Sequence, residues 1–153
     1  MTGFLGEYEV SMDAKGRFLL PAGFKKQLPE GSGEAYVIMR GMERCLNLYT
    51  MEGWEELSQK ISRYNDVKPA VQKYKRLLFS GSTRLEPDAA GRLLLPKQLQ
   101  EYAGLRKDLI FSAQGNRIEL WDSKTYYDYL NANAADLSRL ADEISGPGYL
   151  DPF

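Results

Sequence analysis

The apolar residues of this 153-residue chain occur in short clusters, and their spacing predicts a mixture of strands and helices. Apolar and polar positions alternate over residues 45–49, a pattern typical of a strand with one buried face. Unbroken apolar runs at residues 17–20 and 92–95 predict strands that are buried on both faces. Residues 136–145 carry apolar side chains at helical spacing, and the Gly-Pro-Gly sequence that follows ends this predicted helix.

The two halves of the chain predict the same succession of elements. Each begins with a strand, at residues 6–11 or 81–86, which leads through a tight turn to the apolar run and then to a short helix. Pro21 and Pro96 suit the first position of these helices, where a missing N–H costs nothing. Thr50 and Asp122 can cap the closing helices. The remaining predicted elements are hairpins at residues 35–39 with 45–49 and 109–113 with 117–121, closing helices at 51–64 and 123–131, and a linking helix at 70–79.

The halves share the motif Asp-Ala-x-Gly-Arg-x-Leu-Leu-Pro, which occurs at residues 13–21 and again at 88–96. With an offset of 75, nine of the eighteen residues from 4 to 21 are identical in the second half. Such a duplication predicts two structural repeats related by internal pseudo-symmetry. We therefore divide the chain into a first repeat at residues 5–58, a linking helical segment at 59–79, a second repeat at 80–130, and a helical and mobile tail at 131–153.

Composition narrows the classes of function. Hydrophobic residues make up 43% of the chain, enough for a packed core. We expect a cytoplasmic protein without a membrane partner, because no signal peptide is recognisable and no apolar stretch approaches the roughly 18 residues that span a bilayer. The chain has no histidine and a single cysteine, Cys45, which argues against most triads, zinc sites and any intrachain disulfide. We expect no enzyme activity, cofactor, metal or small-molecule substrate.

Charges are separated along the chain, although the net charge is only −1. Residues 60–84 hold seven basic side chains and one acidic one, whereas residues 119–153 hold seven acidic and two basic ones. Local potential steers a charged ligand more than net charge does. The basic segment is therefore a candidate binding surface, although half of it is explained as the solvated face of the linking helices.

The repeated motif is itself a candidate site. Asp-x-x-Gly favours a reverse turn, because Asp can bond the backbone two residues on and Gly accepts a positive φ. Arg17 or Arg92 then projects from the lip of the turn, and Lys15 adds a charge in the first copy only. Two interpretations stay open, namely that the arginines pair with neighbouring carboxylates or that they contact a ligand. Only the arginine, with Lys15, lacks an evident structural requirement in the motif.

Longer segments around the motif resemble a known type of DNA-binding module. They are Gly-Glu-Tyr-Glu-Val-Ser-Met-Asp-Ala-Lys-Gly-Arg-Phe-Leu-Leu-Pro at 6–21, Leu-Asn-Leu-Tyr at 46–49 followed by Trp54, Tyr-Lys-Arg-Leu-Leu-Phe-Ser-Gly at 74–81, Asp-Ala-Ala-Gly-Arg at 88–92 and Ile-Glu-Leu-Trp at 118–121. Over about residues 4–130 the chain resembles the SpoVT-AbrB type of module, and its tandem arrangement resembles the MraZ family of bacterial transcriptional regulators. Met12 departs conservatively from the leucine that is frequent in the family.

The resemblance implies both a fold and a function. The expected fold is α+β and β-rich, a double-split AbrB-like β-barrel formed by two pseudo-twofold-related repeats in one chain, with flanking helices. The expected function is sequence-specific regulation of transcription by a nucleoid-associated ring, usually an octamer. This ring would bind short tandem DNA repeats upstream of its own division and cell-wall gene cluster. Lys15, Arg17 and, through the repeat, Arg92 match the DNA-contacting loops of the family.

The basic residues of the repeated turns are chemically suited to binding double-stranded DNA. Arginine reads guanine bidentately in the major groove and also binds phosphate. A ring of weak modules on tandem sites gains affinity by avidity. Lys25 and Lys26, on the short helix after Pro21, are weaker candidates for phosphate contacts. Because only the first loop carries a lysine, we expect it to bind DNA more strongly than the second.

Two competing functions stay open at this point. Asp13 and Asp88 would form a proton-sharing dyad in a two-lobed aspartic protease, but in this motif each carboxylate should point into its own turn. Antitoxins with the same barrel bind a toxin through a flexible tail, and the acidic tail here offers three anchors, Tyr149, Leu150 and Phe153. The two-repeat length argues against an antitoxin. Under any of these functions an aromatic cluster is a candidate assembly surface, formed by Tyr126, Tyr127 and Tyr129.

Overall fold

The structure is a computed structural model that describes residues 3–32 and 34–150. The first half contains β1 (Glu7–Ser11), β2 (Arg17–Leu19), α1 (Ala22–Lys25), β3 (Tyr36–Arg40), β4 (Leu46–Thr50) and α2 (Met51–Ser62). The second half contains α3 (Pro69–Phe79), β5 (Thr83–Leu85), β6 (Arg92–Leu94), α4 (Lys97–Tyr102), β7 (Asp108–Ala113), β8 (Ile118–Asp122), α5 (Ser123–Asn133), the 3-10 turn η1 (Ala134–Asp136) and α6 (Leu137–Ile144). The α+β class and the predicted succession of elements are confirmed.

The two halves exchange their first strands. The main sheet has the order β1-β7-β8-β4-β3-β5, so β1 of the first half pairs with the hairpin of the second, and β5 pairs with the hairpin of the first. The remaining strands, β2 and β6, form a separate two-stranded sheet. Every sheet contact between the halves is antiparallel, and the six-stranded sheet is not closed into a barrel.

The pairing register follows an internal twofold relation. Phe18 in β2 lies opposite Leu93 in β6, and these two residues are equivalent in the repeat alignment. Asn47 in β4 likewise lies opposite its own equivalent, Glu119 in β8. A residue that faces its own counterpart marks the position of a twofold axis, so the sequence duplication is a structural pseudo-symmetry.

One core serves both halves. Phe111 of β7 has no exposed surface, and its ring packs against three aromatic rings of the first half. The ring centroids lie 5.0 Å from Phe24, 6.2 Å from Tyr8 and 6.5 Å from Phe18. Because a second-half side chain fills a first-half cavity, neither half has a complete core of its own.

Three local predictions need correction. The apolar strands are not buried on both faces, because Leu19 is 54% exposed and Leu94 is 53% exposed on the outer side of the two-stranded sheet. Pro21 and Pro96 stand one residue before α1 and α4 rather than at their first position. Thr50 does cap α2, accepting a hydrogen bond from the Gly53 N–H at 3.1 Å, but the side chain of Asp122 makes no capping bond to α5 and binds an arginine instead.

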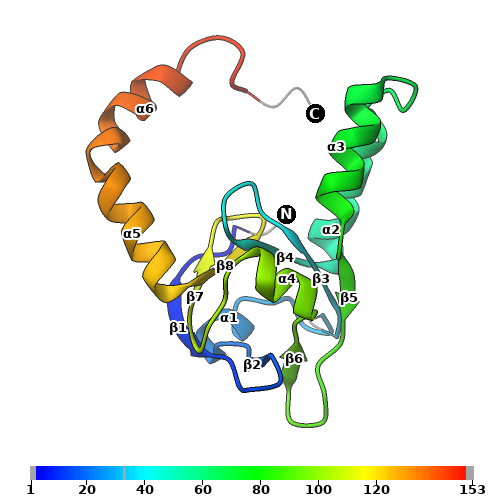
Figure 1. Ribbon diagram of the computed structural model, residues 1–153, viewed down its shortest axis with the longest axis vertical. Helices are drawn as coiled ribbons and strands as arrows, with labels where there is room; N and C mark the ends of the chain where they lie inside the picture. The colour runs from blue at the N-terminus through cyan, green and yellow to red at the C-terminus, as the bar shows by residue number, and fades with distance from the viewer. Residues whose placement is uncertain (1–2, 33, 151–153) are drawn as a thin grey trace.

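The molecule has two distinct ends (Figure 1). The β2–β6 sheet and the turns that precede its strands lie at one end, whereas α2–α3 and α5–α6 extend from the opposite end as two separate projections. Among the described residues no helix combines the length and the apolar character needed to cross a bilayer. The chain thus presents its repeated turns on one end and its long helices on the other.

Candidate nucleic-acid interface

The first turn is built around the carboxylate of Asp13. One oxygen, Oδ1, accepts hydrogen bonds from the backbone N–H groups of Lys15 at 3.0 Å and Arg17 at 2.9 Å. The N–H of Gly16 donates to the Asp13 carbonyl at 3.0 Å, and Gly16 has a φ of 89°, in the region that favours glycine. The repeated Asp and Gly therefore specify the backbone of this turn, as the sequence predicts.

The second turn reproduces the first. Asp88 Oδ1 accepts from the backbone N–H groups of Ala90 and Arg92, both at 2.9 Å, and Gly91 has a φ of 83°. The backbone hydrogen bond from the arginine is the largest influence on each carboxyl, and it lowers the pKa of Asp13 and of Asp88. Each carboxylate thus serves its own turn and is ionised at neutral pH, which is the opposite of a proton-sharing dyad.

The arginine side chains pair with the carboxylates of their own turns, which is one of the two interpretations that the sequence leaves open. Arg17 Nε donates to Asp13 Oδ2 at 2.8 Å, and Arg92 Nε donates to Asp88 Oδ2 at 3.0 Å. The interpretation that the arginines pair with neighbouring carboxylates is therefore confirmed for the Nε edge. Within the described part of the chain, neither guanidinium donates a hydrogen bond from its terminal Nη nitrogens. The ion pair holds each arginine in place while leaving the N–H groups of both terminal Nη nitrogens for an external ligand.

The two turns lie close together. Arg92 Nη1 is 3.8 Å from Asp13 Oδ2, so the arginine of the second turn reaches the carboxylate of the first. The backbone carbonyl of Gly16 also accepts a hydrogen bond from the Leu95 N–H at 2.9 Å. Antiparallel pairing of β2 with β6 brings about this proximity, and it makes the turns one continuous surface with Lys15 exposed at its edge.

A cleft of about 630 Å³ adjoins the first turn and contains further basic residues. Lys15 lines it together with Arg84 of β5 and Lys97 at the start of α4, and both are exposed. Arg84 is partly offset by Glu86, whose Oε1 lies 3.3 Å from Arg84 Nη1. Arg84 belongs to the basic segment 60–84 that the sequence marks as a candidate binding surface, whereas sequence reasoning did not single out Lys97, although it directly follows the repeated motif.

A smaller hollow beside the second turn is less basic. It measures about 360 Å³, and its lining includes Lys25, Glu30 and Gly91. In the repeat alignment Ala90, Glu9 and Ala22 take the places of Lys15, Arg84 and Lys97. The structure therefore places Lys25 beside the second turn rather than the first, and Lys26 is exposed but does not line this hollow.

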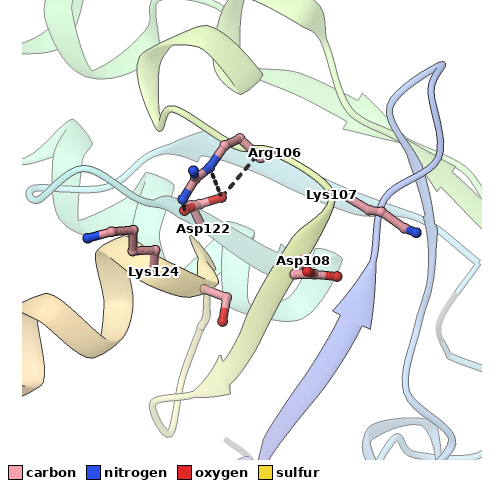
Figure 2. Close-up of a pocket in the computed structure, with 6 residues that line it drawn as sticks. Arg106, Lys107, Asp108, Asp122 and Lys124 are labelled. Carbon is pink, nitrogen blue, oxygen red and sulfur yellow. Dashed lines mark hydrogen bonds and ion pairs between the residues drawn. The ribbon is translucent and has the colours of Figure 1, made fainter.

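A third depression, of about 380 Å³, lies where β7 and α5 begin (Figure 2). Its centre is the buried carboxylate of Asp122, which accepts from the Arg106 backbone N–H at 3.1 Å and from Arg106 Nη2 at 2.8 Å. Burial disfavours ionisation of Asp122, but the hydrogen bonds and charge of Arg106 outweigh it and lower the pKa. The Arg106–Asp122 pair thus anchors the loop before β7 to the end of β8. Lys124 points away from this pair (Figure 2).

These features define a class of protein: two copies of one sheet-and-turn unit, interlocked in a single chain, with paired arginine turns at one end. A family model described as "MraZ protein, putative antitoxin-like" matches residues 4–77 and again residues 78–144. The chain belongs to the MraZ family.

Two relatives match almost the whole chain. A protein of Cytophaga hutchinsonii is 35% identical over 144 residues, which cover 94% of this chain and 95% of the relative. A protein of Halothermothrix orenii is 37% identical over 138 residues, which cover 90% of this chain and 94% of the relative. Both relatives are named transcriptional regulator MraZ.

Proposed function

We propose that this protein is a sequence-specific DNA-binding transcriptional regulator that contacts DNA through its two arginine turns. The observation that carries the proposal is the duplicated turn, in which one carboxylate fixes one arginine by its Nε edge in the same way in both copies. The names of the two relatives support the same function. In this proposal Lys15, Arg17 and Arg92 are the main DNA contacts.

The fixed arginines suit the reading of base edges. An arginine reads guanine by donating two parallel hydrogen bonds to O6 and N7. The two Nη nitrogens, which do not hydrogen-bond to the aspartate, can supply these bonds. Holding the side chain beforehand reduces the rotamer entropy that is lost on binding. Lys15 then contacts phosphate beside the first turn, and Lys25 and Lys26 add weaker phosphate contacts near the second. The first turn is the stronger contact because its cleft holds three basic side chains.

The target and the assembly follow from the resemblance to the family. We propose that the two sheets together form a β-barrel of the AbrB-like, double-split type. Copies of the chain assemble into a ring, usually an octamer, at the nucleoid. The ring binds tandem repeats upstream of its own division and cell-wall gene cluster. A single module makes few contacts and is weak and salt-sensitive, whereas several modules on one DNA gain affinity by avidity.

A fluorescence anisotropy titration with the protein's own upstream DNA tests this function. We expect Lys15→Ala to reduce the slope of log affinity against log salt by about 1, because one phosphate contact is lost. Arg17→Lys keeps the charge but loses the bidentate edge, so it should cost about 1–3 kcal/mol on the specific site and little on random DNA. Lys124→Ala, at an exposed position at the start of α5 that lines neither the turns nor their hollows, is the matched control and should have no effect.

The double variant Arg17→Ala, Arg92→Ala decides the outcome. Each arginine also stabilises its turn through the ion pair with Asp13 or Asp88. The thermal unfolding midpoint of the double variant is therefore measured first, to show that this variant is folded. A folded double variant that binds the upstream DNA as tightly as the unaltered protein would rule out the arginine turns as the DNA-binding surface.

A further inference from the structure

The last helix, α6, buries none of its side chains against the described part of its own chain. It comprises eight residues and none of them is buried. Leu137, Leu140 and Ile144 lie on one face of it and are 80%, 41% and 54% exposed. A helix this short is only marginally stable in water without tertiary contacts. The apolar face of α6 therefore needs a surface that covers it.

The chain carries α6 away from the body of the protein. The first turns of α5 are anchored, because Tyr126 and Tyr129 pack on Trp121 with ring centroids 5.7 and 5.2 Å apart. Beyond this anchor every residue of α5 and η1 is exposed except Asp136, which is partly exposed. In Figure 1 the segment 130–144, which we call the arm, projects from the sheet on the opposite side from α2–α3.

A second projection, formed by α2 and α3, also presents exposed apolar side chains. Helix α3 has no buried residue. Apolar side chains are exposed along the projection, and Tyr64 and Tyr74 pack edge to face with ring centroids 6.3 Å apart. We call this the hairpin surface, and its exposed apolar residues are Tyr64 (51%), Val67 (81%), Tyr74 (39%) and Leu77 (56%).

The arm and the hairpin surface carry opposite charge. Residues 134–144 hold three acidic side chains and one basic, which gives −2, whereas residues 63–79 hold five basic and one acidic, which gives +4. On the arm, Arg139 pairs with Asp136 at 3.4 Å, and among the described residues Asp142 and Glu143 have no ion-pair partner. On the hairpin surface, Lys75 pairs with Asp66, while Lys73 and Arg76 have no such partner in the described part of the chain.

We propose that the arm of one copy packs on the hairpin surface of a second copy, with Leu137, Leu140 and Ile144 against the exposed aromatic and apolar residues of α2–α3. The acidic charge of the arm selects this basic surface and is unsuited to DNA. Because the two surfaces differ, the contact is head-to-tail, and its repetition produces a closed ring or an open filament. The inference rests on the proposed ring and says which residues build it. Both surfaces lie opposite the arginine turns (Figure 1), so assembly leaves the turns free.

Two variants with one defective surface each provide the test. The arm variant is Leu137→Ser, Leu140→Ser, Ile144→Ser, and the hairpin variant is Lys73→Glu, Arg76→Glu, Leu77→Ser. All six positions are exposed, so both variants should fold. By light scattering at micromolar concentration we expect each variant alone to be a monomer of 17.4 kDa. Mixed at equal concentration, they should form a dimer and nothing larger, because only one functional arm and one functional hairpin surface remain.

Other outcomes of the mixing experiment overturn the inference. A mixture that stays monomeric shows that the two surfaces do not meet, and a hairpin variant that still assembles alone shows that arms pair with arms or with another protein surface. A monomeric unaltered protein contradicts both the inference and the ring. The control Lys124→Glu changes the charge of an exposed residue that lies outside both surfaces, and it should assemble as the unaltered protein does.

DNA binding separates this inference from the proposed function. The arm variant should bind a single repeat as the unaltered protein does, but it should lose the affinity gained on tandem repeats, which avidity places at about 100-fold or more. If the arm variant assembles normally while the arginine variants lose DNA binding, the inference falls and the function stands. If the hairpin variant alone loses binding to a single repeat, α2–α3 is a DNA surface and the inference falls.

Discussion

Replacing Phe111 tests whether the two repeats share one core. Phe111→Ala removes a fully buried ring whose three aromatic neighbours all belong to the other half. Buried Phe→Ala substitutions cost about 3–5 kcal/mol, and each lost aromatic pair adds to that cost, so we expect the upper part of this range. With a urea m-value of about 2 kcal/mol/M, the unfolding midpoint should fall by roughly 2 M.

The two tryptophans report on the two halves separately. Trp54 lies on α2 and packs edge to face on Phe79, whereas Trp121 lies on β8. In single-tryptophan proteins made with Trp54→Phe or Trp121→Phe, Phe111→Ala should lower both fluorescence midpoints equally. If the Trp54 signal keeps its midpoint while the Trp121 signal shifts, the halves unfold independently and the shared core is refuted. Phe111→Leu conserves most of the volume and should shift both midpoints by less than about 1 M.

Three further results are expected. Gly16→Ala should destabilise more than Gly91→Ala in urea unfolding, because both require a positive φ but only at Gly16 would the new Cβ displace the Gln100 amide, which donates to the Leu95 carbonyl at 2.9 Å; equal losses would contradict this. The folded-state pKa of Asp122 is lowered, so its stabilisation is present above the ordinary pKa of 3.8 and disappears below it. The stability gap between the protein and Asp122→Asn should therefore narrow in acid unfolding below about pH 4. Burial raises the pKa of Cys45 to about 12, so a thiol reagent at pH 8 should label it only as fast as the protein opens; rapid labelling would show that the site is exposed.

Local chemistry made the turns predictable. Asp13 and Gly16 form their turn through contacts between residues at most four apart, and such short-range preferences are visible in the sequence. The twofold relation between the halves was predictable from the duplicated motif, because equivalent sequences adopt equivalent structures. The role of the arginine Nε was not predictable from the motif, since a guanidinium can turn either toward the carboxylate or into solvent.

Long-range pairing accounts for what the sequence did not reveal. Arg84 and Lys97 line the cleft beside Lys15 because β5 joins the sheet of the other half, and no local pattern encodes that exchange. The apolar runs did not disclose that Leu19 and Leu94 face outward, because hydrophobicity alone does not say whether a second layer covers a strand. The functions of Lys25, Lys26 and the turn residues toward DNA remain predictions for the binding experiments.

Because the first strands are exchanged, β1 cannot complete its pairing during synthesis until β7 has been made. Tyr8 of β1 faces Phe111 of β7, a partner that lies 103 residues later in the chain. At about 5–20 residues per second, a ribosome takes roughly 5–20 s to produce that interval. Throughout this time β1 is without its ladder and its apolar side chains lack their core. The nascent first repeat therefore exposes apolar side chains until β7 is made, and a message truncated before β7 yields a chain that cannot complete its fold.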